Sequence, residues 1–508
     1  MVIQRAFGMK KNVPVSKDQK LRKTKTALLV CLIASSLFLS VHVWFGEELW
    51  PEGCNSFVVM FKNSPIVKTL FTKNIYSMPK ENLSTPRKLV LTNYSERSVY
   101  YNSNENFKPV TDAIKPFMAE TLRSRENIKN KLTVDETEWY NVLRNDELLD
   151  TRSIYVDYYI ASAPALFARM IGIKETWLSD DVSAVKEFII APGKDNEMLF
   201  YVRDFSDNKI YKYFVSYEKK DVINKIMNEY TRGESEGSFP FSFELNLYGS
   251  SAGIGSGVVQ KVFLNPMITL STGNEQHVVL YTANPVTGDK ITENLLPTFG
   301  FRQSARRHYT SADGVEYFVE NYSVLKFYPN GLIEYTADDE RLAPSLSDEP
   351  LSLYEVLNKA IEFSENVWSN CVDDSFNAIV TSNLLESADS SGTYNFTLDY
   401  YVNGVPVKIE LSGDNFADMN HAVEISVKNG KIIKYRQFIR KYTESGESVT
   451  NSRSIEALDE IYKNLSESGS ETHIDDIFLS YIEDGSLNLK SPVWCAEISG
   501  GGLYKGES

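Results

Sequence analysis

The chain has 508 residues, with 53 Lys and Arg against 68 Asp and Glu, and a formal net charge of −15 at pH 7. Residues 1–25 hold eight basic residues and one acidic residue, so the rest of the chain carries a net charge of −22. Such an acidic exterior argues against binding to nucleic acids or other anionic polymers. The four cysteines form no Cys-x-x-Cys motif or Cys/His cluster, so a zinc site has no support, whereas a Cys371–Cys495 disulfide stays open.

An apolar run, Ala27–Phe45, is the first structural signal in the chain. As a helix of about 20 residues it spans roughly 30 Å, the thickness of the hydrocarbon core of a bilayer. Basic residues precede it and Glu47 and Glu48 follow it, which predicts a cytoplasmic N-terminus and an extracytoplasmic location for the bulk of the chain. Because no small-x-small cleavage site follows, we expect an uncleaved, single-pass anchor in the cell membrane rather than a signal peptide.

The anchor also contains small and hydroxyl residues, which let membrane helices approach closely and form hydrogen bonds with each other. These transmembrane interaction candidates are Ala34, Ser35, Ser36 and Ser40. His42 fits either a polar contact inside the membrane or a position near the outer interface, and we favour the second.

Regular apolar patterns begin after the irregular residues 46–83, which resemble a juxtamembrane stalk. Alternating apolar residues predict strands, and a spacing of three to four residues predicts helices. Up to the polar break at 232–238, strands are expected at 87–94, 153–160, 186–192, 197–204 and 209–217, and helices at 107–122, 139–143, 163–171 and 222–230.

The next block should consist mainly of strands, and its second boundary should be the acidic, proline-containing stretch Asp338–Pro350. A short helix is plausible over Asn294–Phe299. The turn at Asn330-Gly331 lies between two β-rich runs, which is typical of a hairpin. The expected strands are 239–249, 258–270, 305–311, 315–321, 323–329 and 332–337.

After Pro350 the pattern predicts two amphipathic helices, 353–367 and 455–465, with strands between and after them. Asn403-Gly404 and Asn429-Gly430 predict hairpin turns. The expected strands are 394–402, 406–411, 421–427, 431–442 and 474–484. Residues 422–437 weakly repeat the pattern of 323–337, which raises the hypothesis of an internal duplication.

The predicted fold class is therefore α+β: a single N-terminal transmembrane helix followed by three extracytoplasmic α+β modules with antiparallel sheets. The expected organisation is a cytoplasmic tail (1–25), a transmembrane helix (26–45), a stalk (46–84), an N-terminal domain (85–234), a middle domain (239–340), a C-terminal domain (350–498) and a tail (499–508).

The sharpest catalytic motif is Gly249-Ser250-Ser251-Ala252-Gly253, the G-x-S-x-G pattern of a nucleophile elbow. An elbow requires a helix after the serine, but the glycines and β-branched residues that follow begin a helix poorly. A glycine-rich surface loop is the preferred interpretation, and an exported hydrolase using Ser251 is the alternative. Four acid pairs, Asp180-Asp181, Asp338-Asp339, Asp373-Asp374 and Asp475-Asp476, are interpreted as solvated caps. No catalytic, cofactor-binding or metal-binding residue is predicted.

The order of these segments resembles the YycH family of membrane-anchored accessory proteins. The likeness is carried by the anchor, by SIYVDYYIASAPALFARMIG (153–172), and by LLPTFGFRQSARRHYTSADGVEYFVENYSVLKFYPNG (295–331). The C-terminal module, from Asn403-Gly404 through EALDEIYKNL to SPVW, also resembles the sister family YycI. The chain departs from the family in its longer N-terminal tail, its stalk and its last ten residues.

The resemblance implies a regulator and not an enzyme. Such proteins associate with the WalK/YycG-type sensor histidine kinase of the cell-wall two-component system of low-GC Gram-positive bacteria and adjust its output. The expected partners are therefore this kinase, a YycI-like membrane protein and, through one helix, the lipid bilayer, with no cofactor and no nucleic acid. A passive scaffold for cell-envelope proteins is a further alternative.

Overall fold

The computed structural model describes most of the chain after residue 84, within the compact unit Met78–Ser508. In that part of the chain no helix combines the length and apolarity needed to cross a bilayer. The expected tail, anchor and stalk at 1–84 lie outside the described residues. The described ranges are 85–94, 96–144, 151–231, 239–245, 262–271, 275–302, 307–320, 322–347, 350–382, 384–385, 392–411, 419–468, 471–500 and 502–506.

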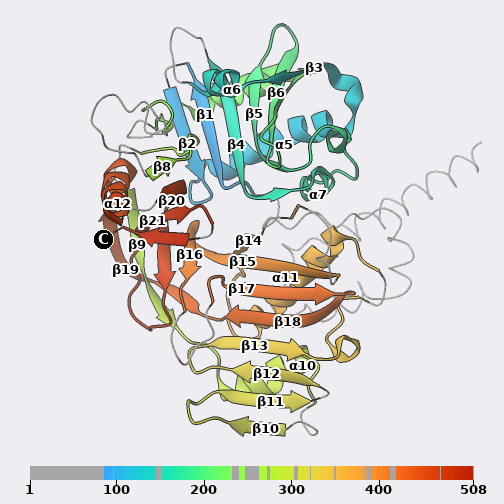
Figure 1. Ribbon diagram of the computed structural model, residues 1–508, viewed down its shortest axis with the longest axis vertical. Coiled ribbons are helices and arrows are strands. Elements are labelled where there is room, and N and C mark those ends of the chain that lie inside the picture. The colour runs from blue at the N-terminus through green and yellow to red at the C-terminus, as the bar shows by residue number, and fades with distance from the viewer. Residues whose placement is uncertain are drawn as a thin grey trace, which may run out of the picture. The chain divides into compact units, whose positions relative to one another are not determined.

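The N-terminal part forms a seven-stranded antiparallel sheet with the order β2-β1-β4-β5-β6-β7-β3 (Figure 1). All six residues of β1 are buried, because the centre of this sheet is covered on both faces. The strands are β1 (Lys88–Asn93), β2 (Glu96–Tyr101), β3 (Ile128–Val134), β4 (Arg152–Ser162), β5 (Val185–Pro192), β6 (Glu197–Asp204) and β7 (Ile210–Ser216).

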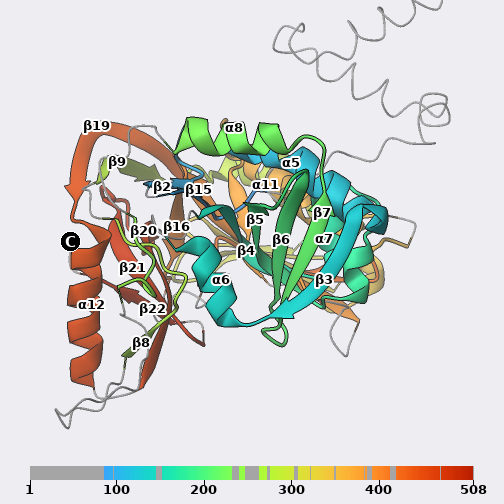
Figure 2. The same cartoon turned by 90° about the horizontal axis from the view of Figure 1, so that it is seen from above.

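Helices cover the two faces unequally. Figure 2 shows α5 (Phe107–Arg123) and α8 (Lys220–Tyr230) on one face and α6 (Glu136–Leu143) on the other. Phe117 of α5 and Met227 of α8 belong to one core, whereas Trp139 of α6 belongs to the core beneath the opposite face. The short elements η2 (Arg125–Asn127), α7 (Pro164–Met170) and η4 (Trp177–Asp180) complete this part.

The remaining chain builds a thirteen-stranded sheet with the path β10-β11-β12-β13-β18-β17-β15-β16-β20-β21-β22. Strand β14 pairs with β15 and β8 pairs with β20, outside this path. The strands are β8 (Val262–Leu264), β10 (Arg307–Thr310), β11 (Glu316–Glu320), β12 (Ser323–Phe327), β13 (Leu332–Ala337), β14 (Ala378–Val380), β15 (Thr393–Val402), β16 (Val405–Ile409), β17 (Val423–Lys428), β18 (Lys431–Phe438), β20 (Thr472–Glu483), β21 (Val493–Ile498) and β22 (Gly502–Lys505).

Helix α11 (Leu353–Ser369) packs on the middle of this sheet. It begins at a capping box, in which the Ser352 side chain and the Glu355 side chain each bind the other residue's backbone N–H. Helix α12 (Ser454–Ser468) packs near the C-terminal edge over β20 and β21. The short helical elements α9 (Gly288–Lys290), η5 (Ile291–Leu295), α10 (Leu296–Thr298) and η6 (Glu340–Leu342) connect strands.

A separate two-stranded ribbon joins β9 (Glu275–Ala283) to β19 (Lys441–Asn451). The pairing contains an irregularity between Glu444 and Ser448. The expected strand 431–442 therefore ends earlier than predicted, at Phe438, and a new strand begins at Lys441.

The mixed fold with antiparallel sheets is confirmed, although β20 pairs in parallel with β16 and with β8. Most of the expected strands and helices are confirmed as well. The strands β2, β3, β9, β14 and β21 have no counterpart among the expected elements, and three further details differ from the predictions. The proposed boundary at 338–350 lies inside one continuous sheet, because β13 pairs with β18 across it. The expected tail 499–508 contributes β22, which pairs with β21. The described part of the expected strand 239–249 makes only an isolated bridge, from Phe241 to Thr269.

Candidate functional site

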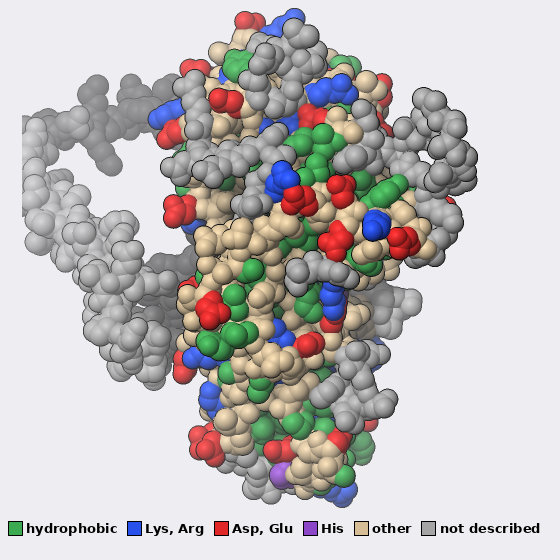
Figure 3. Space-filling model, turned by 90° about the vertical axis from the view of Figure 1, so that its left-hand side faces the viewer, with side chains coloured by type: hydrophobic (Ala, Val, Ile, Leu, Met, Phe, Trp, Pro, Cys, Tyr) green, Lys and Arg blue, Asp and Glu red, His purple; other side chains and the backbone are tan. Residues whose placement is uncertain are grey.

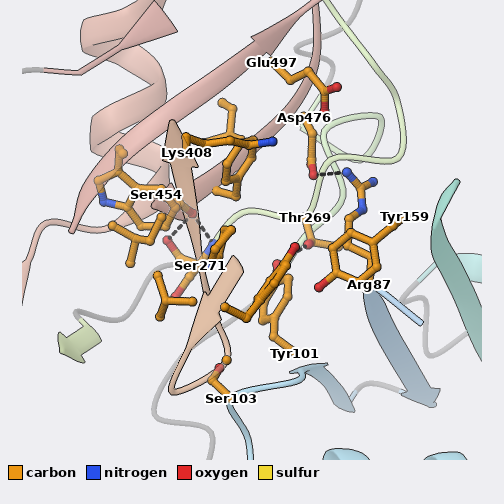
Figure 4. Close-up of a pocket in the computed structure, with 18 of the residues that line it drawn as sticks. Arg87, Tyr101, Ser103, Tyr159, Thr269, Ser271, Lys408, Ser454, Asp476 and Glu497 are labelled. Carbon is orange, nitrogen blue, oxygen red and sulfur yellow. Dashed lines mark hydrogen bonds and ion pairs between the residues drawn. The ribbon is translucent and has the colours of Figure 1, made fainter. Parts of the chain in front are cut away.

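The seven-stranded sheet and the thirteen-stranded sheet meet around a cavity of about 210 Å³. Its walls come from β2, β4 and β5 of the first sheet, from β15, β16, β20 and β21 of the second, and from the segments around Thr269 and Ser454. Figure 4 shows residues from these distant parts of the chain pointing into one space. The lining residues include Arg87, Tyr101, Tyr159, Lys186, Tyr401, Lys408, Asp476, Trp494 and Glu497.

Arg87 is the central charged group of one wall. Its guanidinium forms ion pairs with Asp157 of β4 and Asp476 of β20, and its backbone N–H donates to the carbonyl of Asp157 at 2.7 Å. Burial opposes the charged form, but the two carboxylates outweigh it and raise the pKa of Arg87 well above its usual value. The arginine therefore stays charged while it joins the two sheets.

Hydroxyl groups and aromatic rings line the adjacent surface. The Tyr101 hydroxyl lies 3.2 Å from the Thr269 hydroxyl. The rings of Tyr159 and Tyr401 meet edge to face, with 5.5 Å between their centroids. Burial raises the pKa of Tyr159 to about 12, so its hydroxyl is neutral at physiological pH.

A second charge cluster lies behind the wall formed by β16. Asp399 is fully buried and accepts hydrogen bonds from Lys408 Nζ at 2.7 Å and from His421 Nδ1 at 3.0 Å. Burial alone would raise the pKa of Asp399, but Lys408 and His421 lower it to about 2. The cluster keeps Lys408 in place, 5.8 Å from the centre of the Phe478 ring.

The polar groups of the cavity wall also include paired serines. The Ser454 hydroxyl accepts a hydrogen bond from the Ser271 backbone N–H at 2.6 Å. Among the described residues, no group of three or more His, Cys, Asp or Glu side chains is arranged to hold a metal ion.

Another buried charge network lies at the C-terminal end of β20. Arg440 is completely buried and donates to the carbonyls of Asn330 and of Gly485, the latter at 2.8 Å. Its Nε lies 3.8 Å from Glu483 Oε1, and its guanidinium lies over the Phe438 ring at 4.4 Å. The network ties two turns to the link between β18 and β19, so its role is structural.

The structure does not describe the residues that the sequence singles out as candidates. Ala34, Ser35, Ser36, Ser40 and His42, and the alternative nucleophile Ser251, all lie outside the described residues.

The interpretation of the acid pairs as solvated caps is wrong for two of the aspartates. Asp181 pairs with Lys131 at 2.6 Å and its side chain is 10% exposed. Asp476 is predicted to lie in a solvated cap, but it lies in β20, is mostly buried and pairs with Arg87. The apolar residues around Asp476 in the sequence could have indicated its role, because a carboxylate inside a buried strand requires a partner. Asp339, in contrast, caps η6 as expected, by accepting from the Arg341 backbone N–H at 3.0 Å.

One face of the molecule illustrates the distribution of its charged side chains. Figure 3 shows one face of the molecule, on which acidic and basic side chains are interspersed with apolar ones. An interspersed surface of this kind lacks the continuous basic stripe that binds phosphate backbones.

The described residues include two free cysteines. Cys371 and Cys495 are both buried and unbonded, so the Cys371–Cys495 disulfide left open by the sequence is not formed. Burial raises the pKa of the Cys371 thiol to about 11 and of the Cys495 thiol to about 12, so neither is an activated nucleophile.

The comparisons with known proteins identify the architecture. No protein-family model and no curated protein sequence matches the chain. Its structure is similar to the crystal structure of YycH from Bacillus subtilis, with a TM-score of 0.50 over 83% of this chain and 95% of that chain, at 11% sequence identity. An identity this low shows a shared fold and no more, and the expected likeness to YycI stays a prediction. The chain therefore has the fold of YycH.

Proposed function

We propose that this protein is a membrane-anchored regulator that binds a sensor histidine kinase and modulates two-component signalling in cell-wall metabolism. The observation that carries the proposal is the YycH fold, since the similarity covers 95% of the chain in the Bacillus subtilis crystal structure. The apolar run after a basic tail supports a location in the cell membrane, with the described domains outside the cell.

The proposed mechanism is association between anchored proteins. Small and hydroxyl residues at 34–40 would pack against a helix of the kinase, at about 0.5–2 kcal/mol for each polar contact. The extracytoplasmic domains would add a larger contact with the kinase and with a YycI-like protein. The state of the kinase would then depend on both regions.

The decisive experiment replaces residues 27–45 by a polyleucine span that preserves topology and export. We expect kinase co-purification and target-gene output to fall, because polyleucine lacks the small and hydroxyl residues. Unchanged co-purification and output would mean that the anchor is only a tether. Complete absence of kinase binding by the unmodified chain would refute the proposal and favour the passive scaffold.

Topology is tested separately by cysteine labelling of intact cells. A cysteine introduced in residues 1–25 should be protected from an impermeant reagent, and one introduced in 232–238 should react. The reverse pattern contradicts the proposed location.

The hydrolase alternative has its own variant. Ser251→Ala should leave the signalling phenotype unchanged, because the residues after Ser251 begin a helix poorly. Loss of function in a folded and exported Ser251→Ala protein would favour the hydrolase.

A further inference from the structure

The cavity between the two sheets is large enough for an organic ligand. Its volume of about 210 Å³ is many times the roughly 10–15 Å³ that a single water molecule requires by the same measure. A cavity with convergent polar groups and aromatic walls is the usual form of a small-molecule site.

The charges that line the cavity are largely paired, because three cations meet four carboxylates once the buried partners are counted. Arg87 is paired with Asp157 and Asp476, and Lys408 is paired with Asp399. Two lining residues of opposite sign, Lys186 and Glu497, have no ion pair within the part of the chain that the structure describes. An anionic ligand would enter a site with no surplus of positive charge. The one extra carboxylate, Asp157, is buried and bound to Arg87, so it is not open to a cationic ligand. The desolvation of a charged ligand would therefore not be repaid.

The remaining lining groups are rings and hydroxyls. The Trp494 indole is fixed by a hydrogen bond from its Nε1 to the Ser452 carbonyl at 2.9 Å, and Phe478 lies on the neighbouring strand. Figure 4 shows the Tyr101 and Tyr159 side chains close to Thr269 and Arg87 in the same space. The cavity therefore combines flat apolar surfaces with hydrogen-bonding groups of both kinds.

A sugar ring has the matching chemistry. It is neutral, it presents C–H groups on its faces to aromatic rings, and it carries hydroxyls around its edge for carboxylates, guanidinium and hydroxyl groups. We propose that this cavity binds a neutral carbohydrate of one or two rings. The inference goes beyond the proposed regulation and does not depend on a kinase.

The test uses the full-length chain in a detergent without a sugar head group. The probes are glucose and N-acetylglucosamine as neutral sugars, acetate and methylammonium as single charges, and benzyl alcohol as an apolar ring. Binding is followed by saturation-transfer NMR on the probe and by tryptophan fluorescence. We expect at least one sugar to bind and the three other probes to bind at least about tenfold more weakly.

Three variants locate the site. Trp494→Ala should weaken sugar binding by about tenfold or more, because it removes a ring surface. Tyr101→Phe retains the ring and removes only the hydroxyl near Thr269, so it should weaken sugar binding by a smaller factor. This milder variant keeps the test valid if Trp494→Ala fails to fold. Tyr309→Ala, at an exposed position on β10 outside the cavity, should leave binding unchanged.

Two results would overturn the inference. One is the absence of binding of either sugar up to about 10 mM, and the other is equal or tighter binding of a charged or apolar probe. Neither result bears on kinase co-purification, which is measured on a different complex.

Discussion

Arg87 and Asp476 lie 389 positions apart in the sequence and form an ion pair that connects the seven-stranded sheet to β20. The same guanidinium binds Asp157 of β4, so one side chain is shared by both sheets. Neither carboxylate has much access to water, since their side chains are 3% and 10% exposed for Asp157 and Asp476. Removing Arg87 would leave two like charges close together in a buried setting.

Arg87→Met should therefore lower the free energy of unfolding by about 2–4 kcal/mol. The loss should be smaller than that for a fully buried ion pair, because the Arg87 side chain is 21% exposed and partly screened by water. Urea titration followed by circular dichroism measures the change. Arg341→Met is the matched control, since Arg341 pairs with Asp339 at the surface and its loss should have little effect. Equal effects of the two variants would contradict the role given to Arg87.

A second contact between the sheets depends on Gly404. This residue has φ +77°, and a Cβ at this position would overlap the backbone N and Cα atoms of Ser103. Gly404→Ala should destabilise the fold by more than the roughly 1–3 kcal/mol of a strained backbone alone. Gly446→Ala separates the two causes, because Gly446 has φ +83° and no atom within 4 Å of its added Cβ. If the two variants melt at the same temperature, the close approach to Ser103 is not a tight contact.

The Asp399 cluster predicts a loss of stability in acid. The pKa of Asp399 is lowered from 3.8 to about 2, so the unfolded chain binds its proton more readily between these values. The stabilisation is present above pH 3.8 and is lost as the pH falls through about 2. It amounts to about 2 kcal/mol, because a tenfold difference in proton affinity between the folded and unfolded chains corresponds to about 1.36 kcal/mol.

Asp399→Asn should remove this pH dependence and lower stability at neutral pH, since Lys408 then lacks its carboxylate. Urea unfolding at a series of pH values between strongly acidic and neutral measures both effects. Asp338→Asn, at an exposed position, serves as the control and should retain the parental profile. A parental acid profile in the Asp399→Asn chain would show that the cluster does not contribute.

The elements predicted from the sequence are those whose own apolar pattern identifies them. The Asn429-Gly430 turn is one example, because both residues adopt positive φ and the flanking strands alternate as expected. Strand β19 was missed, since its residues are half-buried or exposed and its sequence carries no apolar alternation. It is a strand because β9 pairs with it, which is a tertiary cause.

The weak repeat between 323–337 and 422–437 has a structural counterpart. The two hairpins lie side by side, because β13 pairs with β18, and Tyr335 is the direct partner of Tyr435. The sequence could indicate that the hairpins were alike, but it contains no information on which strands would meet. The cavity could not be predicted for the same reason, since its walls combine residues from Arg87 to Glu497 and no short motif contains them.

The two buried thiols give a final test of the C-terminal fold. Cys371 and Cys495 are unbonded, and burial raises the pKa of each thiol to about 11 and about 12 respectively. At mildly alkaline pH both should be neutral and shielded in the folded chain, so a thiol reagent should modify them only as fast as the structure opens. In a chain carrying Cys31→Ser and Cys54→Ser, we expect slow labelling in buffer and rapid labelling of both thiols in denaturant. Mass spectrometry counts the adducts. Failure to label in denaturant without reductant would mean that the two cysteines are linked. That bond would require Cys371, in the turn after α11, to lie against Cys495 of β21, which would contradict the arrangement described here.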